Sequence, residues 1–156
     1  MTKELAAGDM APAFDLPASG GERVSSRQLH GRKVVLFFYP KDDTPTCTRE
    51  AIDFNRLRDA FEKTGTALVG VSVDDAASHA KFARKHALAI PLISDETRSL
   101  IDAYGLWVKK SMFGHAYMGT ERTTVLIGAD GRIARIWRKV KTPGHAEEVL
   151  AAAQSA

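Results

Sequence analysis

The chain has 156 residues, of which 44% are hydrophobic and 26% are charged, as is ordinary for a globular protein. Its net charge of +3 comes from lysines and arginines spread along the sequence, without the basic stripe typical of nucleic-acid binding. No apolar run approaches the ~20 residues of a membrane-spanning helix. We therefore expect one domain over residues 1–156 that binds neither nucleic acid nor membrane.

Cysteine content indicates the compartment. The sequence contains one cysteine, so it cannot form an intramolecular disulfide. A single free thiol suits a reducing compartment. The first nine residues also lack the apolar core of a signal peptide. These features predict a cytoplasmic protein.

The N-terminal part of the chain combines turn signals with one strongly apolar run. Residues 13–24 contain a Ser-Gly-Gly-Glu turn signal and are expected to form a small hairpin. Ser25 and Gln28 have the spacing of a capping box, which predicts a single helical turn. The continuous apolar run at 34–38 predicts a strand buried on both faces of a parallel sheet.

The middle of the chain is predicted to form a strand, a helix and a second strand. Apolar residues recur at helical spacing from 46 to 63, and Gly65 is placed to end that helix. Residues 67–73 form a second apolar run. A strand, helix and strand of these lengths form a crossover unit between parallel strands.

The remaining segments continue the alternation. They are predicted as a helix at 76–87 capped by Asp74 or Asp75, a strand at 91–94, a helix at 96–103, a long loop at 109–119, strands at 122–127 and 133–140, and a helix from 143 to about 154. The segment 109–119 lacks clear periodicity and carries two glycines, as a loop that serves a site often does. The order of elements predicts an α/β fold.

The one cysteine lies where the strand at 34–38 leads into a helix. Thr44 suits the N-cap, and Pro45 suits the first helical position. Cys47 is then the third helical residue, within the turn whose N–H groups lack backbone partners. Those groups and the helix dipole favour negative charge, so we expect Cys47 to act as a thiolate nucleophile.

Peroxide reduction would use such a thiolate together with donors that hold the peroxide. The Thr44 hydroxyl can accept and donate in the same pocket. Arg122 opens a predicted strand, where a charge needs a partner, and it is our candidate for the missing cation. Arg49 is the competing candidate. Glu50 could orient the arginine.

Each of these residues also has an ordinary structural role. A lone cysteine is commonly a small buried hydrophobe, Thr44 alone is a helix cap, and Arg122 alone is a surface charge. Pro40 is expected to pack over the sulfur and limit water, or simply to end the strand. Only the coincidence of these residues around Cys47 is specific.

Other chemistries have weaker support. The five histidines show no close ligand spacing, and one cysteine cannot form a thiolate cluster, so we expect no metal. The sequence contains no Gly-x-Gly-x-x-Gly or Walker-type loop, so we expect no cofactor. A protease-like cysteine–histidine pair stays open by spacing, although no histidine stands out as its base.

The motif Pro40-x-x-x-Thr44-x-x-Cys47 resembles the active-site signature of peroxiredoxins. The longer wording at 38–48 is similar to the peroxiredoxin Q branch, also called bacterioferritin comigratory proteins. Similar stretches cover nearly the whole chain: Ala11-Pro12-x-Phe14-x-Leu16, Phe82 to Pro91-Leu92-Ile93-Ser94-Asp95, Tyr104-Gly105-Leu106-Trp107 and Gly114-x-x-Tyr117-x-Gly119-x-x-Arg122.

The resemblance implies a three-layer thioredoxin-like sandwich with an N-terminal hairpin extension, present as a monomer or homodimer. It implies a peroxidatic Cys47 that is assisted by Thr44, Arg122 and Pro40. It further implies reduction of hydrogen peroxide and alkyl hydroperoxides at the expense of thiols.

Two positions depart from the family pattern. Many members carry a resolving cysteine where this chain has Ile52, others carry it around 82–84, and neither place has one here. The sulfenic acid of Cys47 would then be resolved by an external thiol such as thioredoxin, glutaredoxin or a small thiol. Thr46 stands where glycine is common, and its bulk lies beside the sulfur.

The missing resolving cysteine keeps a second hypothesis open. In it the protein is a non-catalytic redox-sensing or binding module that forms mixed disulfides through Cys47. General thiol–disulfide exchange is less favoured, because a Cys-x-x-Cys motif is missing.

Overall fold

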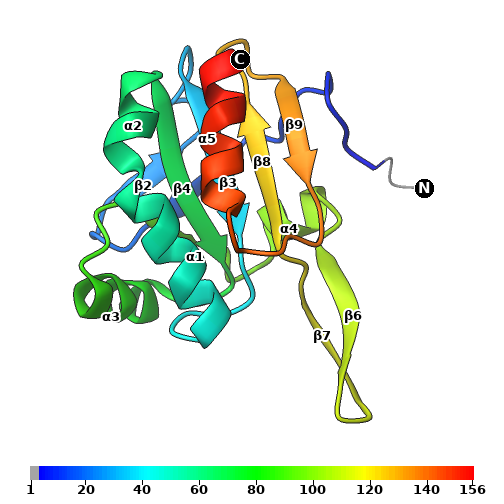
Figure 1. Cartoon of the computed structure of the whole chain (residues 1–156). Helices are drawn as coiled ribbons and strands as arrows, with labels where there is room; N and C mark the ends of the chain where they lie inside the picture. The colour runs from blue at the N-terminus through cyan, green and yellow to red at the C-terminus, as the bar shows by residue number, and fades with distance from the viewer. Residues whose placement is uncertain (1–3) are drawn as a thin grey trace.

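A computed structural model describes residues 4–156. Its centre is a five-stranded sheet (Figure 1) made of β3 (Lys33–Phe38), β4 (Thr66–Ser72), β5 (Leu92–Ser94), β8 (Thr123–Ile127) and β9 (Ile133–Trp137). The strand order is β5-β4-β3-β8-β9. Strand β3 pairs parallel with β4 and antiparallel with β8, so the sheet is mixed.

Strand β3 is central because every residue after Lys33 is apolar. Its alternate side chains enter two different cores, with Val35 and Phe37 on one face and Val34, Leu36 and Phe38 on the other. All five are buried. The prediction of a strand buried on both faces is therefore confirmed, but the expected parallel sheet is wrong, because β8 pairs antiparallel with β3.

Helices and a small hairpin cover the two faces of the sheet, as Figure 1 shows. One face carries α1 (Pro45–Arg56), α2 (Arg58–Lys63), α3 (Ala76–His86) and α5 (His145–Ser155). The other face carries α4 (Ser99–Ala103) and the hairpin of β1 (Asp15–Pro17) and β2 (Arg23–Ser25). This arrangement is the predicted three-layer sandwich with an N-terminal hairpin.

Several predicted helices differ in length from the observed ones. The helix expected over 46–63 is divided at Leu57, whose ψ of 6° ends α1 before α2 begins. Helix α4 starts at Ser99 rather than 96, because the Asp95 carboxylate accepts the Ile101 N–H at 2.7 Å. The capping box closes only a turn: Ser25 and Gln28 exchange side-chain-to-backbone hydrogen bonds of 3.2 Å.

The prediction of a long loop at 109–119 is wrong. The segment is a hairpin of β6 (Trp107–Met112) and β7 (His115–Thr120), which projects from the body of the protein (Figure 1). Its two turn residues, Phe113 and Gly114, both have positive φ, as a two-residue hairpin turn requires. The hairpin lacks alternation in its sequence because most of its residues are exposed on both faces.

No helix within residues 4–156 combines the length and apolar character needed to cross a bilayer.

Candidate active site

The loop that joins β3 to α1 positions the cysteine as predicted. Thr44 is the N-cap with extended backbone, Pro45 is the first helical residue, and Cys47 is the third. The Thr48 N–H donates to the Thr44 carbonyl at 2.8 Å, so the helical N–H groups before it have no intrahelical partner. The Thr44 hydroxyl makes no capping bond and donates instead to the Lys41 carbonyl at 2.9 Å.

The sulfur of Cys47 is buried in largely apolar surroundings, with one cation beside it. The residue is 2% exposed and belongs to a cluster that includes Tyr39, Ala51 and Phe54. Nη2 of Arg122 lies 3.2 Å from Sγ, within hydrogen-bond range for sulfur. The side chain predicted to supply positive charge is therefore in contact with the sulfur.

A buried carboxylate holds the other side of the same guanidinium. Oε1 of Glu50 accepts a hydrogen bond of 2.7 Å from Nη1 of Arg122. Burial raises the pKa of Glu50 to about 7, against the lowering effect of Arg122. Burial alone would lower the pKa of Arg122, but the charges of Glu50 and Cys47 raise it, so the guanidinium stays charged.

The other candidate residues, Arg49 and Pro40, are less closely tied to Cys47. Arg49, the competing cation, is exposed on α1, and Arg122 is the arginine at the sulfur. Pro40 is half-buried in the loop after β3. Its expected packing over the sulfur stays a prediction. The second oxygen of Glu50 has no hydrogen-bond partner among residues 4–156.

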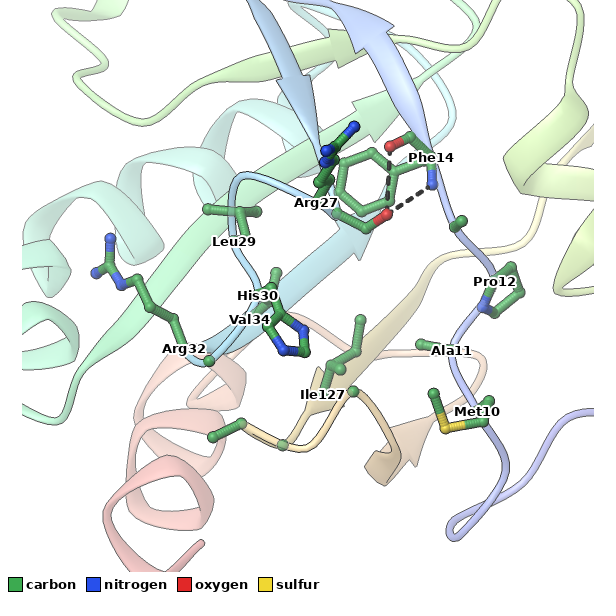
Figure 2. A pocket seen from close by; sticks show the side chains of 16 residues that line it. Met10, Ala11, Pro12, Phe14, Arg27, Leu29, His30, Arg32, Val34 and Ile127 are labelled. Carbon is green, nitrogen blue, oxygen red and sulfur yellow. Dashed lines mark hydrogen bonds between the residues drawn. The ribbon is translucent and has the colours of Figure 1, made fainter.

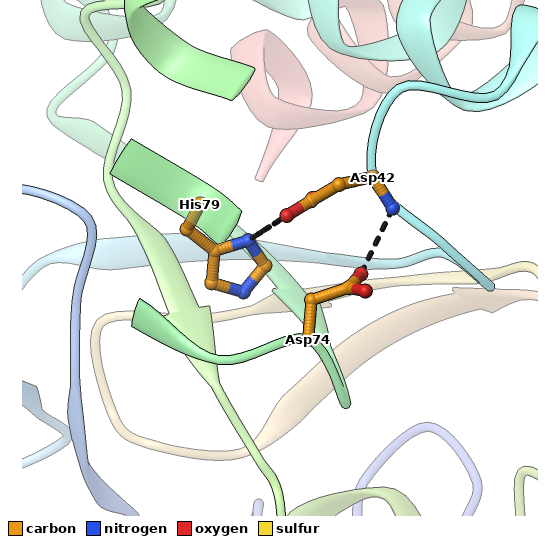
Figure 3. Close-up of side chains that lie close together, drawn as sticks. All are labelled: Asp42, Asp74 and His79. Carbon is orange, nitrogen blue, oxygen red and sulfur yellow. Dashed lines mark hydrogen bonds and ion pairs between the residues drawn. The ribbon is translucent and has the colours of Figure 1, made fainter. Parts of the chain in front are cut away.

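The loop before Cys47 is anchored by a buried network that sequence reasoning missed. Asp42 and His79 form an ion pair in which Oδ2 and Nδ1 are 2.8 Å apart, with side chains 4% and 0% exposed. The Tyr39 hydroxyl donates to Oδ1 of Asp42 at 2.6 Å, and Ser78 Oγ donates to Oδ2 at 2.8 Å. The Asp42 N–H donates to the Asp74 carboxylate at 2.8 Å (Figure 3).

The partners of His79 orient its ring. Nε2 lies 3.0 Å from the Ile93 carbonyl, which can only accept, so this nitrogen carries a hydrogen. Nδ1 faces the Asp42 carboxylate. Burial and the Asp42 carboxylate raise the pKa of Tyr39, so its hydroxyl remains a donor.

Asp42, Asp74 and His79 also have the donor types of a metal site, with ligand atoms within 4.8 Å of one another. Their oxygens and nitrogens already take part in hydrogen bonds to neighbouring protein groups. These three residues form a hydrogen-bonded anchor between the loop that precedes α1, α3 and the end of β4. The prediction of a protein without a metal is not tested by this arrangement.

A second anchor lies one residue further on. Asp43 has a φ of 58°, in the left-handed region, and pairs with Lys85 at 2.7 Å and His86 at 3.0 Å. Hydrogen bonds from these two side chains lower the pKa of Asp43. The loop between β3 and α1 is thus held to both ends of α3.

The β6–β7 hairpin brings a lysine to the edge of the site. Nζ of Lys110 donates to the Thr120 carbonyl at 2.5 Å. Its stem crosses Gly119, where an added Cβ would lie 3.3 Å from the lysine Cδ. Burial and the charge of Arg122 lower the pKa of Lys110, whereas Cys47 raises it. The lysine therefore lies within electrostatic reach of the reactive sulfur.

An apolar cavity of about 310 Å³ lies elsewhere in the fold. Figure 2 shows that Met10, Pro12 and Phe14 face it from the N-terminal segment, and Ile127 from the end of β8. Arg122 precedes the opposite end of β8. None of the four predicted site residues lines this cavity.

The chain is similar to known proteins both in sequence and in fold. Residues 7–136 match the AhpC/TSA family. The chain belongs to that family.

Relatives with curated names indicate the branch of the family to which the chain is similar. A putative peroxiredoxin Bcp of Coxiella burnetii is 44% identical over 92% of this chain and 95% of its own length. The peroxiredoxin Bcp of Bacillus subtilis is 42% identical over 96% of this chain and 94% of its own length.

Solved structures agree with the fold. A peroxiredoxin Q of Xanthomonas campestris superposes with a TM-score of 0.89 at 41% identity, covering 96% of this chain and 97% of its own. A Xylella fastidiosa peroxiredoxin Q gives 0.92 at 36% identity, with 98% of both chains covered. A further X. campestris structure, at 0.89 and 40% identity over 96% of this chain and 98% of its own, concerns alkyl peroxide reduction by bacterioferritin comigratory protein.

The predicted thioredoxin-like fold and the resemblance to the peroxiredoxin Q, or Bcp, branch are therefore confirmed. Proteins of this class are thiol-dependent peroxidases, and this chain is such an enzyme. Its substrate is a peroxide and its reductant a thiol.

Proposed function

We propose that Cys47 is the peroxidatic residue of a one-cysteine mechanism, assisted by Thr44, Arg122 and Pro40. The observation that carries this proposal is the 3.2 Å contact between Arg122 Nη2 and the sulfur at the first turn of α1. A fixed guanidinium and unpaired helical N–H groups both stabilise negative charge on sulfur.

In the first step the thiolate of Cys47 attacks one oxygen of the peroxide in line. An S–O bond forms, the O–O bond breaks, and water or an alcohol leaves after taking up a proton. Arg122 and the first-turn N–H groups are placed to stabilise charge on the oxygens. The Thr44 hydroxyl donates to Lys41 in the resting enzyme, so its free lone pair is the part available to a peroxide O–H.

We propose hydrogen peroxide and alkyl hydroperoxides as substrates. The alkyl peroxide activity of the X. campestris relative supports the second class. The largely apolar surroundings of Cys47 are compatible with an alkyl group.

The second step needs an external thiol, because these 156 residues contain no other cysteine. The thiol attacks the sulfenic sulfur, releasing water and leaving a mixed disulfide, which a further thiol reduces to restore Cys47. Thioredoxin, glutaredoxin or a small thiol can each supply these electrons. The single free thiol supports a cytoplasmic location, where such reductants are kept reduced.

The test is the rate of Cys47 thiol loss on mixing the reduced protein with hydrogen peroxide or an alkyl hydroperoxide. The reference is a small free thiolate, and because each ~1.4 kcal/mol off the barrier raises the rate tenfold, activation of several kcal/mol would raise the rate of Cys47 by orders of magnitude. Cys47→Ser should abolish turnover while the fold is retained. Turnover that survives in Cys47→Ser would refute the assignment.

Steady-state turnover separates the enzyme from a redox sensor. A peroxidase consumes many equivalents of peroxide while thiol is supplied. A sensor that forms a stable mixed disulfide stops after one equivalent.

A further inference from the structure

The β6–β7 hairpin carries an unusual concentration of exposed apolar side chains. Six large hydrophobic residues within residues 4–156 are strongly exposed, and four of them lie in this hairpin. We call these four the hairpin patch: by the strand register, Met112 (56% exposed) and Tyr117 (44%) share one face of the hairpin, Met118 (50%) lies on the other, and Phe113 (94%) is at the tip. An exposed group of this kind on a small protein indicates contact with a partner.

Fold stability does not account for the residue at the tip. Phe113 has a φ of 51°, and the left-handed region strains any side chain larger than glycine. Two-residue turns of this type favour asparagine or aspartate at that position. Phe113 gains no compensating burial, since it is 94% exposed. Its presence is better explained by a contact made outside the monomer.

The hairpin is joined directly to the reactive site. Strand β7 ends at Thr120, two residues before the arginine that contacts the sulfur. Lys110 of β6 is bonded to the Thr120 carbonyl and interacts electrostatically with Arg122 and Cys47. Figure 1 shows the hairpin projecting from the same end of the molecule at which α1 begins.

A protein reductant would need a docking surface near this site. Cys47 is 2% exposed and offers almost no surface of its own. A protein that delivers a thiol to it must take its contacts from neighbouring residues, and apolar and aromatic side chains supply most of the energy of such contacts.

Charge indicates the nature of the partner. Residues 107–120 contain Lys109, Lys110 and His115 and no carboxylate. Two copies of this chain meeting hairpin to hairpin would set like charges against one another. A partner with apolar surface and acidic side chains around its thiols is complementary.

We propose that the β6–β7 hairpin is the docking surface for a protein dithiol that reduces oxidised Cys47. This inference rests on the proposed one-cysteine mechanism. A thiolate of the partner attacks the sulfenic sulfur, an S–S bond forms, the S–O bond breaks, and hydroxide leaves as water with a proton. The partner's second thiolate then attacks its own sulfur in the mixed disulfide, releasing Cys47 as a thiolate and the partner as a disulfide.

The test compares a protein reductant with a small one. Thioredoxin, with its reductase and NADPH, is the protein probe, and dithiothreitol is the small thiol. The variants are Phe113→Asn, in which the new residue suits the turn, and Met112→Ser. Met10→Ser is the matched control, because Met10 is also a methionine with 56% exposure but lines the cavity far from Cys47.

Both hairpin variants are expected to raise the KM for thioredoxin by about 5- to 30-fold, the effect of removing a docking hot spot. The rate of Cys47 oxidation by peroxide and the turnover with dithiothreitol should stay unchanged. Met10→Ser should match the wild type in all three measurements. Lys109→Glu should also raise the KM for thioredoxin, since the exposed lysine would face an acidic partner.

Four results would overturn the docking proposal. The first is an unchanged KM for thioredoxin in both hairpin variants, and the second is a loss of turnover that is equally large with dithiothreitol. The third is that thioredoxin does not reduce the wild-type protein although dithiothreitol does. The fourth is that the wild type is a dimer which the variants dissociate without a change in the KM for thioredoxin. Failure of the peroxidase mechanism is distinguishable, because the wild type would then consume no peroxide with either reductant.

Discussion

Glu50 and Arg122 form an ion pair of 2.7 Å in which the carboxylate side chain is 2% exposed. The same guanidinium contacts the Cys47 sulfur at 3.2 Å. One buried acid therefore fixes the direction in which the cation faces the nucleophile. Truncating the arginine would leave Glu50 buried without its partner, so a conservative replacement is the better probe of its role.

Arg122→Lys is expected to slow the reaction of Cys47 with hydrogen peroxide by about 10- to 100-fold, because a lysine lacks the rigid fork in which one guanidinium nitrogen reaches Glu50 and the other reaches the sulfur. Stopped-flow measurement of thiol loss gives the rate directly. Arg49→Lys is the matched control on the exposed side of α1 and should react like the wild type. If Arg49→Lys slowed the reaction and Arg122→Lys did not, Arg49 rather than Arg122 would be the cation that assists Cys47.

Glu50→Gln tests the proton linkage of the pair. Burial raises the pKa of Glu50 from 4.5 to about 7, so between these pH values the folded protein holds a proton that the unfolded chain has released. The wild-type free energy of unfolding therefore carries a contribution that falls as pH rises from about 4.5 to 7. Glutamine keeps the shape and an acceptor for Arg122 but has no proton to lose.

Urea unfolding of both proteins across this pH range checks the linkage. The difference in unfolding free energy between wild type and Glu50→Gln should change with pH in the direction stated. A difference that stays constant from pH 4.5 to 7 would mean that the buried carboxyl titrates alike in the folded and unfolded chains.

Local sequence signals predicted much of the fold and the place of Cys47 in it. The run at 34–38 is apolar enough to define a central strand, and Thr44-Pro45 defines where the helix starts. Together they fix Cys47 at the third helical position. Arg122 was predicted because a charge at the start of a core strand needs a partner, and its contact with Glu50 satisfies that need.

The rest depends on contacts between distant parts of the chain. Asp42 and His79 are 37 positions apart, and an aspartate in a turn or a histidine in a helix is unremarkable by itself. The hairpin of β6 and β7 escaped detection because exposure on both faces removes the alternation by which strands are predicted. Its turn carries Phe113-Gly114 in place of the usual asparagine–glycine pair.

His145 is expected to destabilise the fold in acid. Its Nε2 lies 2.8 Å from the Thr124 hydroxyl, and its ring packs edge-on against Phe54 and Trp137. Burial lowers the pKa of His145 from 6.5 to about 4. Between these values the unfolded chain binds a proton that the folded protein excludes, so the free energy of unfolding falls as pH falls from about 6.5 to 4.

His145→Gln keeps a polar group for Thr124 and does not titrate. Its unfolding free energy should lose less between pH 6.5 and 4 than that of the wild type, as measured by urea unfolding. His30→Gln replaces an exposed histidine and should leave the wild-type pH dependence intact. Equal acid sensitivity in wild type and His145→Gln would assign the effect to other groups.

The Asp42–His79 pair is expected to be important for stability, because removing one member leaves the other buried without its partner. Asp42→Asn should lower the free energy of unfolding by about 3–5 kcal/mol. Asp15→Asn is the matched control, since the Asp15–Arg23 pair is of similar length, 3.0 Å, but has side chains 65% and 59% exposed. This exposed pair should contribute no more than about 1 kcal/mol.

Denaturant unfolding at neutral pH measures both variants on one scale. Because Asp42 also anchors the loop that leads to Cys47, the thiol of Asp42→Asn should react more slowly with peroxide even where the variant is fully folded. The rate should be measured at a temperature well below the unfolding transition of the variant. Equal stability losses in Asp42→Asn and Asp15→Asn, together with an unchanged thiol rate, would show that the network neither stabilises the fold nor holds the loop.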